Sequence, residues 1–276
     1  LAAPQVTRGW ETVLAKVKRA VVFMDAACAE TLHWGGGGAG RLLGAGALNI
    51  KEFSSFEAGG ADQPKAVFVV SSLLKGRTVD IIRDIVSLSN FQYCVVVTAV
   101  SHAEGAGSQA VFEQFEEKLC QWMGNMNYTA EVLHAPLFLA PVSSHLFVTP
   151  AFASLFPMTP QDLALLNQAR PEKKKFGNLN DIDFSSLPPA LQLQIRMLVS
   201  GLNSLLEYLN VREECFAIGA LSRIIAGDLA NYSQAKTRRK TAQKRASFIF
   251  IDRTLDLTGD CKWPNVKFSL NRCHYI

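Results

Sequence analysis

The chain has 276 residues, and 49% of them are hydrophobic, which is enough to bury at least one full core and parts of a second. This composition excludes a disordered tail. The 28 Lys and Arg residues only slightly outnumber the 24 Asp and Glu residues, so the net charge of +4 does not by itself indicate a nucleic-acid partner.

The sequence carries no pattern for secretion or membrane insertion. The chain opens with Leu1 and then a basic, amphipathic segment, and we interpret the absence of Met as a missing or trimmed start. The most apolar stretch, residues 132–156, is interrupted by prolines and predicts no transmembrane span. The 6 cysteines include no Cys-x-x-Cys pair, which is typical of free thiols in a reducing compartment. We expect a cytoplasmic protein.

The first half of the chain alternates between amphipathic stripes and uninterrupted apolar runs. Helical spacing of apolar residues predicts helices at residues 10–17, 79–86 and 112–122. A glycine-rich stretch, Gly35 to Gly46, predicts a flexible loop. Buried strands separated by amphipathic helices are typical of a parallel sheet covered on both faces. We therefore predict that residues 1–137 form a small parallel α/β, Rossmann-like domain. The predicted strands are residues 20–24, 66–70, 93–97 and 131–139.

We predict that residues 138–259 form an incomplete second α/β domain that is rich in helices. Thr159-Pro160-Gln161-Asp162 has the chemistry of a helix start, and apolar positions from Leu191 to Leu209 predict a long helix with one buried face. The remaining predicted elements are a second helix over residues 212–232, a polar basic loop over 236–245 and a buried strand over 248–251. Residues 260–276 have no apolar period.

Gly35, Gly37 and Gly40 satisfy the G-x-G-x-x-G pattern of dinucleotide-binding loops. That pattern must follow the first strand directly, whereas about ten residues intervene here, so we interpret the glycines as a flexible loop. A nucleotide-binding, Rossmann-like enzyme stays as the alternative. The sequence has no G-x-S-x-G or P-loop pattern, and its histidines lack metal-ligand spacing. We therefore predict no catalytic residue, no metal and no cofactor.

A cluster of basic residues between the predicted helix and strand has two readings. It could be a nuclear-import or nucleic-acid patch, but it lacks the interleaved aromatic residues that stack on bases. We interpret it as a solvated loop that could contact an acidic membrane or partner. Its members are Lys236, Arg238, Arg239, Lys240, Lys244 and Arg245.

The most specific motif follows the predicted strand at residues 248–251. Asp252, Arg253 and Asp256 form a D-R-x-x-D pattern, which Thr258 follows. This motif resembles the signature of the Sec/Munc family, the syntaxin-binding proteins of vesicle fusion. The order of helix, polar loop and strand before the motif also resembles this family, and the resemblance runs from Gly9 to Gly259.

Residues 19–25, 63–70 and 91–97 resemble the first three strands of the family's first domain. Two features depart from it. Residues 71–76 replace an aromatic, proline and threonine signature, which affects the standard syntaxin-binding surface. Residues 260–276 resemble nothing in the family, and we interpret them as an alternative or mis-predicted terminus.

The resemblance implies a scaffold without catalytic activity. Its partners would be syntaxin-type SNARE proteins or vesicle-tethering proteins, and nucleic acid is not among them. Such a protein assists vesicle-mediated protein transport and membrane fusion, and associates peripherally with secretory-pathway membranes. We interpret the D-R-x-x-D motif as structural, with Asp256 accepting from the Arg253 guanidinium and Thr258 closing the turn. The alternative is that Arg253 points outward and contacts a partner.

Overall fold

The computed structural model describes residues 3–35, 37–100, 107–143, 145–155 and 158–253. The chain divides into two compact units, Leu1–Ala151 and Phe152–Ile276. Among the described residues, none of the helices combines the length and the apolar character needed to cross a membrane.

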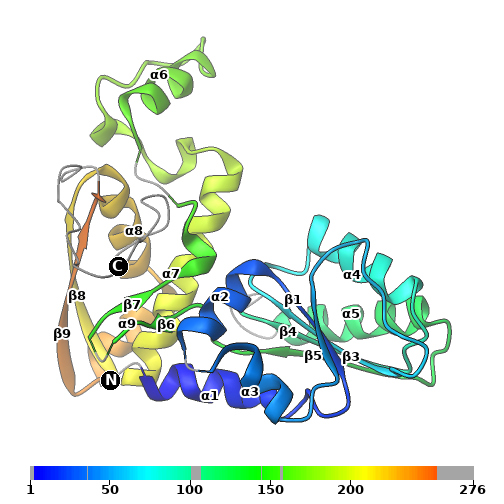
Figure 1. Cartoon of the computed structure of the whole chain (residues 1–276). Coiled ribbons are helices and arrows are strands. Elements are labelled where there is room, and N and C mark those ends of the chain that lie inside the picture. The colour runs from blue at the N-terminus through cyan, green and yellow to red at the C-terminus, as the bar shows by residue number, and fades with distance from the viewer. Residues whose placement is uncertain (1–2, 36, 101–106, 144, 156–157, 254–276) are drawn as a thin grey trace, which may run out of the picture. The chain divides into compact units, whose positions relative to one another are not determined.

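Unit 1 is built on a five-stranded sheet, and every neighbouring pair of its strands is parallel (Figure 1). The strand order is β2-β1-β3-β4-β5, so the chain reverses its direction of winding between β1 and β3. Four of the strands occupy the predicted apolar runs, which confirms the predicted parallel α/β class. The strands are β1 (Val21–Met24), β2 (Asn49–Glu52), β3 (Lys65–Val70), β4 (Tyr93–Thr98) and β5 (Thr129–His134).

Both faces of the sheet are buried, because residues of opposite parity along β1, β3 and β4 are all inaccessible to solvent. On one face, Phe23 and Phe68 stack with ring centroids 5.1 Å apart, and Ile82 and Leu119 pack on the same cluster from two helices. The helices of unit 1 are α1 (Ala3–Leu14), α2 (Ala26–Trp34), α3 (Gly38–Gly44), α4 (Arg77–Ser87) and α5 (Gly107–Met123).

The prediction of a flexible glycine-rich loop after Gly35 was wrong. α3 occupies Gly38–Gly44, and Leu42, which is fully buried, anchors it to the core. Gly37 precedes the helix with a φ of 103°, a conformation that glycine adopts without strain. Burial of one leucine and packing against α2 therefore override the low helix propensity of the glycines.

We predict that residues 9–137 fold independently, because their strands and helices bury one another. Limited proteolysis should release them as a stable fragment, detectable by mass spectrometry. The antiparallel pair β6 (Ala140–Pro141) and β7 (Phe147–Val148) follows the predicted boundary, and β6 contacts α1 and α2. Loss of the protected core on cleavage near residue 138 would show that this pair is required and would move the boundary toward residue 151.

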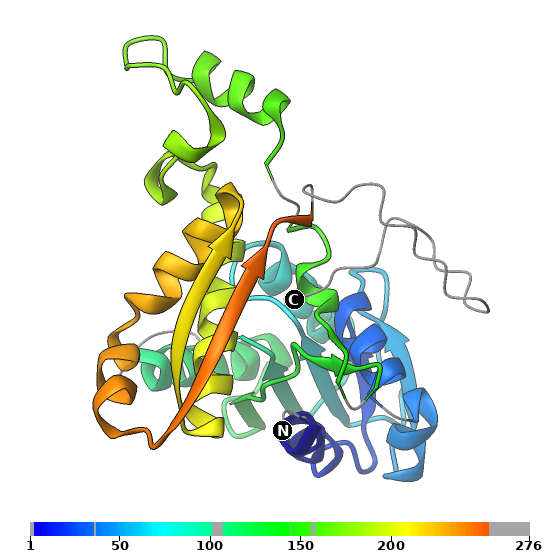
Figure 2. The ribbon, with the colours of Figure 1, turned by 90° about the vertical axis from the view of Figure 1, so that its left-hand side faces the viewer.

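Unit 2 contains a two-stranded parallel sheet with helices beside it (Figure 2). The predicted long helix is confirmed as α7 (Pro189–Leu209), and its apolar stripe is buried from Ile195 to Leu205. The predicted helix start at Thr159 is also confirmed: its side chain and that of Asp162 form a capping box. The other elements are η1 (Pro150–Phe152), which spans the division between the units, α6 (Pro160–Gln168), η2 (Leu179–Asp181), η3 (Phe184–Ser186), β8 (Val211–Ile218), α8 (Ala220–Ala230), α9 (Ser233–Thr241) and β9 (Lys244–Ile251).

Three predictions in this unit were wrong. The predicted helix over residues 212–232 begins as the strand β8, and only α8 in its second half is helical. The predicted basic loop over 236–245 is largely the helix α9. The predicted buried strand is longer than expected, and alternate side chains of β9 are exposed, including Ile249 and Ile251. The first of these errors has a long-range cause, because β8 becomes a strand by pairing with β9.

Candidate functional site

At the carboxyl edge of the sheet in unit 1, Asp25 links the end of β1 to the segment that follows β3. Sheets of this strand order bind ligands where the winding reverses, here between β1 and β3. Asp25 follows β1, and its Oδ1 accepts a hydrogen bond of 2.8 Å from the backbone N–H of Cys28 at the start of α2. Its Oδ2 accepts from the N–H and hydroxyl of Ser71, after β3, at 2.5 and 2.8 Å. These donors are therefore engaged within the protein.

The residues beside Asp25 are likewise occupied. The hydroxyls of Ser72 and Thr78 lie 2.6 Å apart, and the Thr98 hydroxyl donates to the Ser72 carbonyl at 3.1 Å. Burial, and secondarily the charge of Asp25, raises the pKa of the Cys28 thiol, so this cysteine is protonated at neutral pH and is a poor nucleophile. The segment that departs from the Sec/Munc signature is thus tied to the sheet and to α4.

The three glycines of the nucleotide-loop alternative lie away from this edge. Gly35 ends α2, and its N–H donates to the Thr31 carbonyl; Gly37 and Gly40 lie before and within α3. A dinucleotide loop must join the first strand to the N-terminus of the following helix. That N-terminus is capped by Asp25, so the geometry gives the nucleotide alternative no support.

Asp252, the first residue of the D-R-x-x-D motif, is buried at the N-terminus of α8. Its carboxylate accepts from the backbone N–H groups of Leu221 and Ser222 at 3.1 and 2.7 Å, which are unpaired donors of the first helical turn. Its own N–H donates to the Ile218 carbonyl at 2.8 Å. Arg253 is half-buried, whereas Asp256 and Thr258 lie outside the described residues.

The sequence did not predict this contact, because α8 precedes Asp252 by some thirty positions. An aspartate directly after an apolar strand is the signal that could have found it. The same arrangement occurs at Asp25 after β1. We therefore keep the structural role of the motif as a proposal, supported at Asp252 by its two hydrogen bonds to α8.

One member of the basic cluster, Arg238, is part of a buried polar network. Its guanidinium donates to both carboxylate oxygens of Glu213 on β8, at 2.8 and 3.1 Å, and to Asn203 Oδ1 on α7. Only 5% of Arg238 and 5% of Glu213 are exposed. This network joins α7, β8 and α9, so the prediction of a solvated cluster was wrong for Arg238. Lys236, Arg239, Lys240, Lys244 and Arg245 are exposed.

The most exposed apolar surface of unit 2 is one face of the β8–β9 sheet, which we call the outer face. Phe216 lies opposite Ile249, and Ile218 lies opposite Ile251, so the four side chains are neighbours on one face. They are 53%, 60%, 53% and 60% exposed, respectively. Parallel sheets are normally covered on both faces, and clustered exposed apolar residues mark interaction surfaces. The outer face is therefore our candidate interaction site.

We predict that the outer face makes the chain prone to self-association. The double variant Phe216→Ser with Ile249→Thr should bind less of an apolar-surface dye and should remain monodisperse at higher concentration. The matched control is Leu165→Ser, which removes a side chain that is 62% exposed on α6. Light scattering and dye fluorescence measure the two effects. A parent chain that is monodisperse at micromolar concentration and binds no dye would contradict the prediction.

The sequence and fold of the chain were compared with those of known proteins. No protein-family profile matches the chain. It is 63% identical over 269 residues to the human (Homo sapiens) Sec1 family domain-containing protein 2, a match that covers 91% of this chain and 39% of the relative. The predicted resemblance to the Sec/Munc family is confirmed. The chain thus spans about two fifths of the length of this relative.

Solved Sec/Munc structures share the fold. The SM protein Vps45, solved in complex with the Qa SNARE Tlg2, matches with a TM-score of 0.60 at 10% identity, over 91% of this chain and 40% of Vps45. Unc18 from Monosiga brevicollis, solved in complex with syntaxin 1, matches with a TM-score of 0.53 at 12% identity, over 92% of this chain and 40% of the other. These likenesses confirm the α/β fold class of the Sec/Munc proteins for this chain.

Proposed function

We propose that this chain acts as a protein-binding scaffold of the Sec/Munc type, which docks on syntaxin-type SNARE proteins or on vesicle-tethering proteins. The observation that carries the proposal is the 63% identity with Sec1 family domain-containing protein 2. The fold shared with Vps45 and Unc18, both solved with a SNARE partner, supports it further. The role would lie in vesicle-mediated transport and fusion, at the cytoplasmic surface of secretory-pathway membranes.

Two features of the structure agree with binding rather than catalysis. At the carboxyl edge of the first sheet, where α/β enzymes hold their ligands, the donors at Cys28 and Ser71 are taken by Asp25. The outer face offers exposed aromatic and branched apolar side chains, beside the ion pair between Arg245 and Glu214, which is the composition of a protein interface.

A direct binding assay tests the proposal. The immobilised chain is exposed to the cytosolic domains of a panel of Qa SNAREs and to purified tether subunits, and binding is followed by interferometry. We expect saturable binding of at least one member, and a loss of about tenfold or more for Phe216→Asp with Ile249→Asp. Leu165→Asp, the matched control, should bind as the parent does.

Two results would contradict the proposed function or the proposed surface. Failure of the whole panel to bind, together with saturable binding of NAD or ATP that is lost in Gly37→Ala with Gly40→Ala, would favour the nucleotide-binding enzyme. Binding of a SNARE that survives Phe216→Asp with Ile249→Asp would keep the function but would assign it to another surface.

A further inference from the structure

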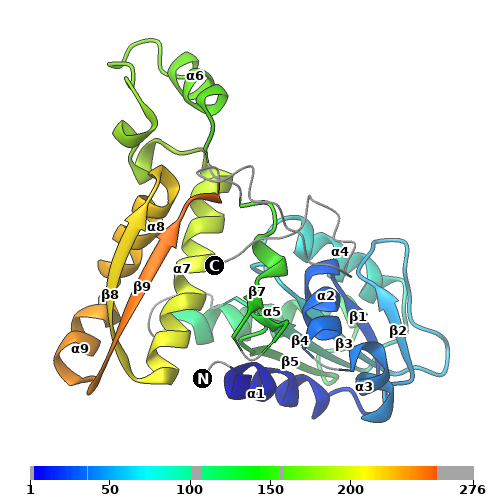
Figure 3. The same ribbon diagram turned by 60° about the vertical axis from the view of Figure 1, so that its left-hand side comes forward.

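One segment of unit 2 combines buried apolar side chains, among them Ile182 and Leu187, with many polar contacts. It runs from residue 158 to 188 and contains α6, η2 and η3; α6 extends away from β8 and β9 (Figure 3). Arg223 of α8 donates to the carbonyls of Asn180 and Ile182 in the same segment. The α6 helix has no buried residue. The Asn167 side chain instead holds the backbone of Phe176 through two hydrogen bonds of 2.8 and 3.1 Å. Apolar side chains of α6 are consequently left partly uncovered.

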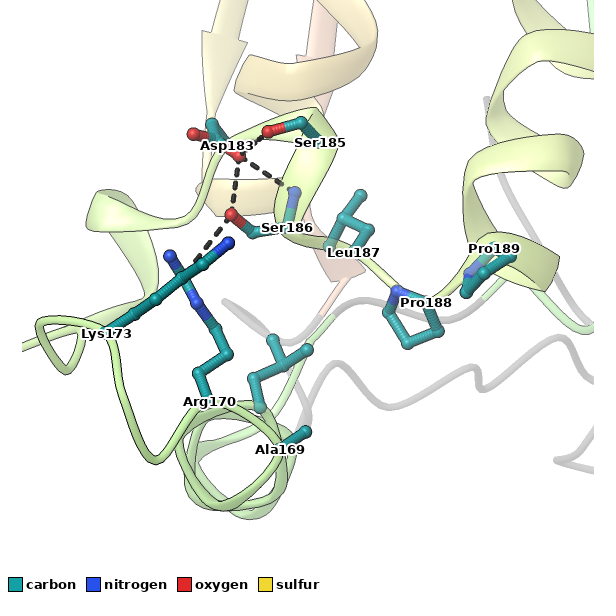
Figure 4. Close-up of a pocket in the computed structure, with 10 residues that line it drawn as sticks. Ala169, Arg170, Lys173, Asp183, Ser185, Ser186, Leu187, Pro188 and Pro189 are labelled. Carbon is teal, nitrogen blue, oxygen red and sulfur yellow. Dashed lines mark hydrogen bonds between the residues drawn. The ribbon is translucent and has the colours of Figure 1, made fainter.

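An open pocket of about 510 Å³ lies on this segment, between the end of α6, η3 and the start of α7 (Figure 4). Leu166, Leu187 and Pro188 line it with apolar surface, and Arg170 and Lys173 bring two cations to it. The pocket thus combines an apolar wall with a positively charged one, which suits a ligand that has both characters.

The cationic side chains of the pocket, Arg170 and Lys173, can each bind a further hydrogen-bond acceptor. The Arg170 guanidinium lies 4.2 Å from the centre of the Phe176 ring and donates from Nη1 to the Ser186 hydroxyl at 3.3 Å. Among the described residues, neither Arg170 nor Lys173 forms a salt bridge. Lys174 and Lys175, which follow in the chain, are exposed and do not line the pocket.

The single carboxylate in the pocket is already occupied. Asp183 Oδ1 accepts from the Ser186 hydroxyl at 2.7 Å, from the Ser185 hydroxyl at 2.8 Å and from the Ser186 N–H at 2.9 Å. Hydrogen bonds from Ser186 and then from Ser185 lower the pKa of Asp183, so it is ionised at neutral pH. Its role is to cap η3, and the lining still carries two cations against one anion.

We propose that this pocket binds an acidic peptide segment in which an apolar side chain lies next to carboxylates. A carboxylate would accept from Lys173 and from the remaining guanidinium N–H groups of Arg170, whose planar fork fits it. The neighbouring apolar side chain would pack between Leu166 and Pro188. This site is separate from the outer face and does not depend on the SNARE partner proposed above.

Fluorescence polarisation of the whole chain with labelled octapeptides tests the proposal. The probe alternates Glu and Leu; one control peptide alternates Lys and Leu, and a second alternates Glu and Ser. We expect saturable binding of the first peptide only, because the site requires both negative charge and apolar surface.

Two charge-reversal variants locate the binding. Lys173→Glu should lower the affinity for the Glu and Leu peptide by about tenfold or more. Lys175→Glu should change this affinity by less than about twofold, although both variants change the net charge equally. Both lysines are exposed, so both variants should keep the parent melting temperature. Equal weakening by the two variants, equal binding of the Glu and Ser peptide, or no saturable binding at millimolar peptide would overturn the proposal.

Discussion

Arg238→Ala is expected to lower the free energy of unfolding of unit 2 by about 3 to 5 kcal/mol, because it leaves the buried carboxylate of Glu213 without its partner. The Glu213 side chain is only 1% exposed and receives both hydrogen bonds of the guanidinium fork. Asn203 also loses the donor to its Oδ1. Urea unfolding followed by circular dichroism measures the change.

Two further variants test whether the loss of stability comes from the unpaired Glu213 carboxylate. Lys240→Ala removes an exposed cation from the same helix and should change stability by less than about 0.5 kcal/mol. Arg238→Met with Glu213→Leu removes both charges and should recover most of the loss, since paired buried charges contribute little beyond well-packed apolar groups. If Arg238→Ala were no more harmful than Lys240→Ala, the network would not hold α7, β8 and α9 together.

Gly219→Ala is expected to destabilise unit 2 by at least about 2 kcal/mol. Gly219 precedes α8 with a φ of 114°, and a Cβ there would lie 2.2 Å from Cγ of Asp252. The substitution therefore strains the backbone and also displaces the carboxylate that caps α8.

Gly227→Ala is the matched control, because it makes the same chemical change inside α8, the helix that Gly219 precedes. Apart from its chain neighbours and the backbone of its own helix, no atom would lie within 4 Å of a Cβ at Gly227, and α8 continues on both sides of it. It should stabilise the protein by about 0.5 to 1 kcal/mol through helix propensity. Opposite shifts of the two melting temperatures would support the capping geometry, and a Gly219→Ala variant as stable as the parent would refute it.

The apolar pattern predicted most of unit 1 and one helix of unit 2. Strands β1, β3 and β4 are almost entirely apolar, because a central strand of a parallel sheet covered on both faces needs apolar residues at nearly every position. Strand β5, at the other edge of the sheet, has the mixed sequence Thr-Ala-Glu-Val-Leu-His. Strand β2, with the sequence Asn-Ile-Lys-Glu, was missed because an edge strand carries polar residues.

The candidate site was only partly visible in the sequence. Asp252 was identified as part of a motif, but its partners at the start of α8 were not, since the two segments meet only in the folded unit. The basic cluster seemed uniformly solvated, whereas Arg238 is buried and its neighbour Arg239 is exposed. A run of charges does not reveal which member faces a buried carboxylate.

The sequence by itself determined the parallel α/β class, the positions of β1, β3 and β4, the buried stripe of α7 and the resemblance to the Sec/Munc family. These properties depend on local periodicity and local motifs, which one sequence displays directly. Only the tertiary structure decided that β8 is a strand, that Asp25 and Asp252 cap helices, and that Phe216 and Ile249 share an exposed face. Each depends on contacts between distant residues, whose energies exceed the small local preferences of the chain.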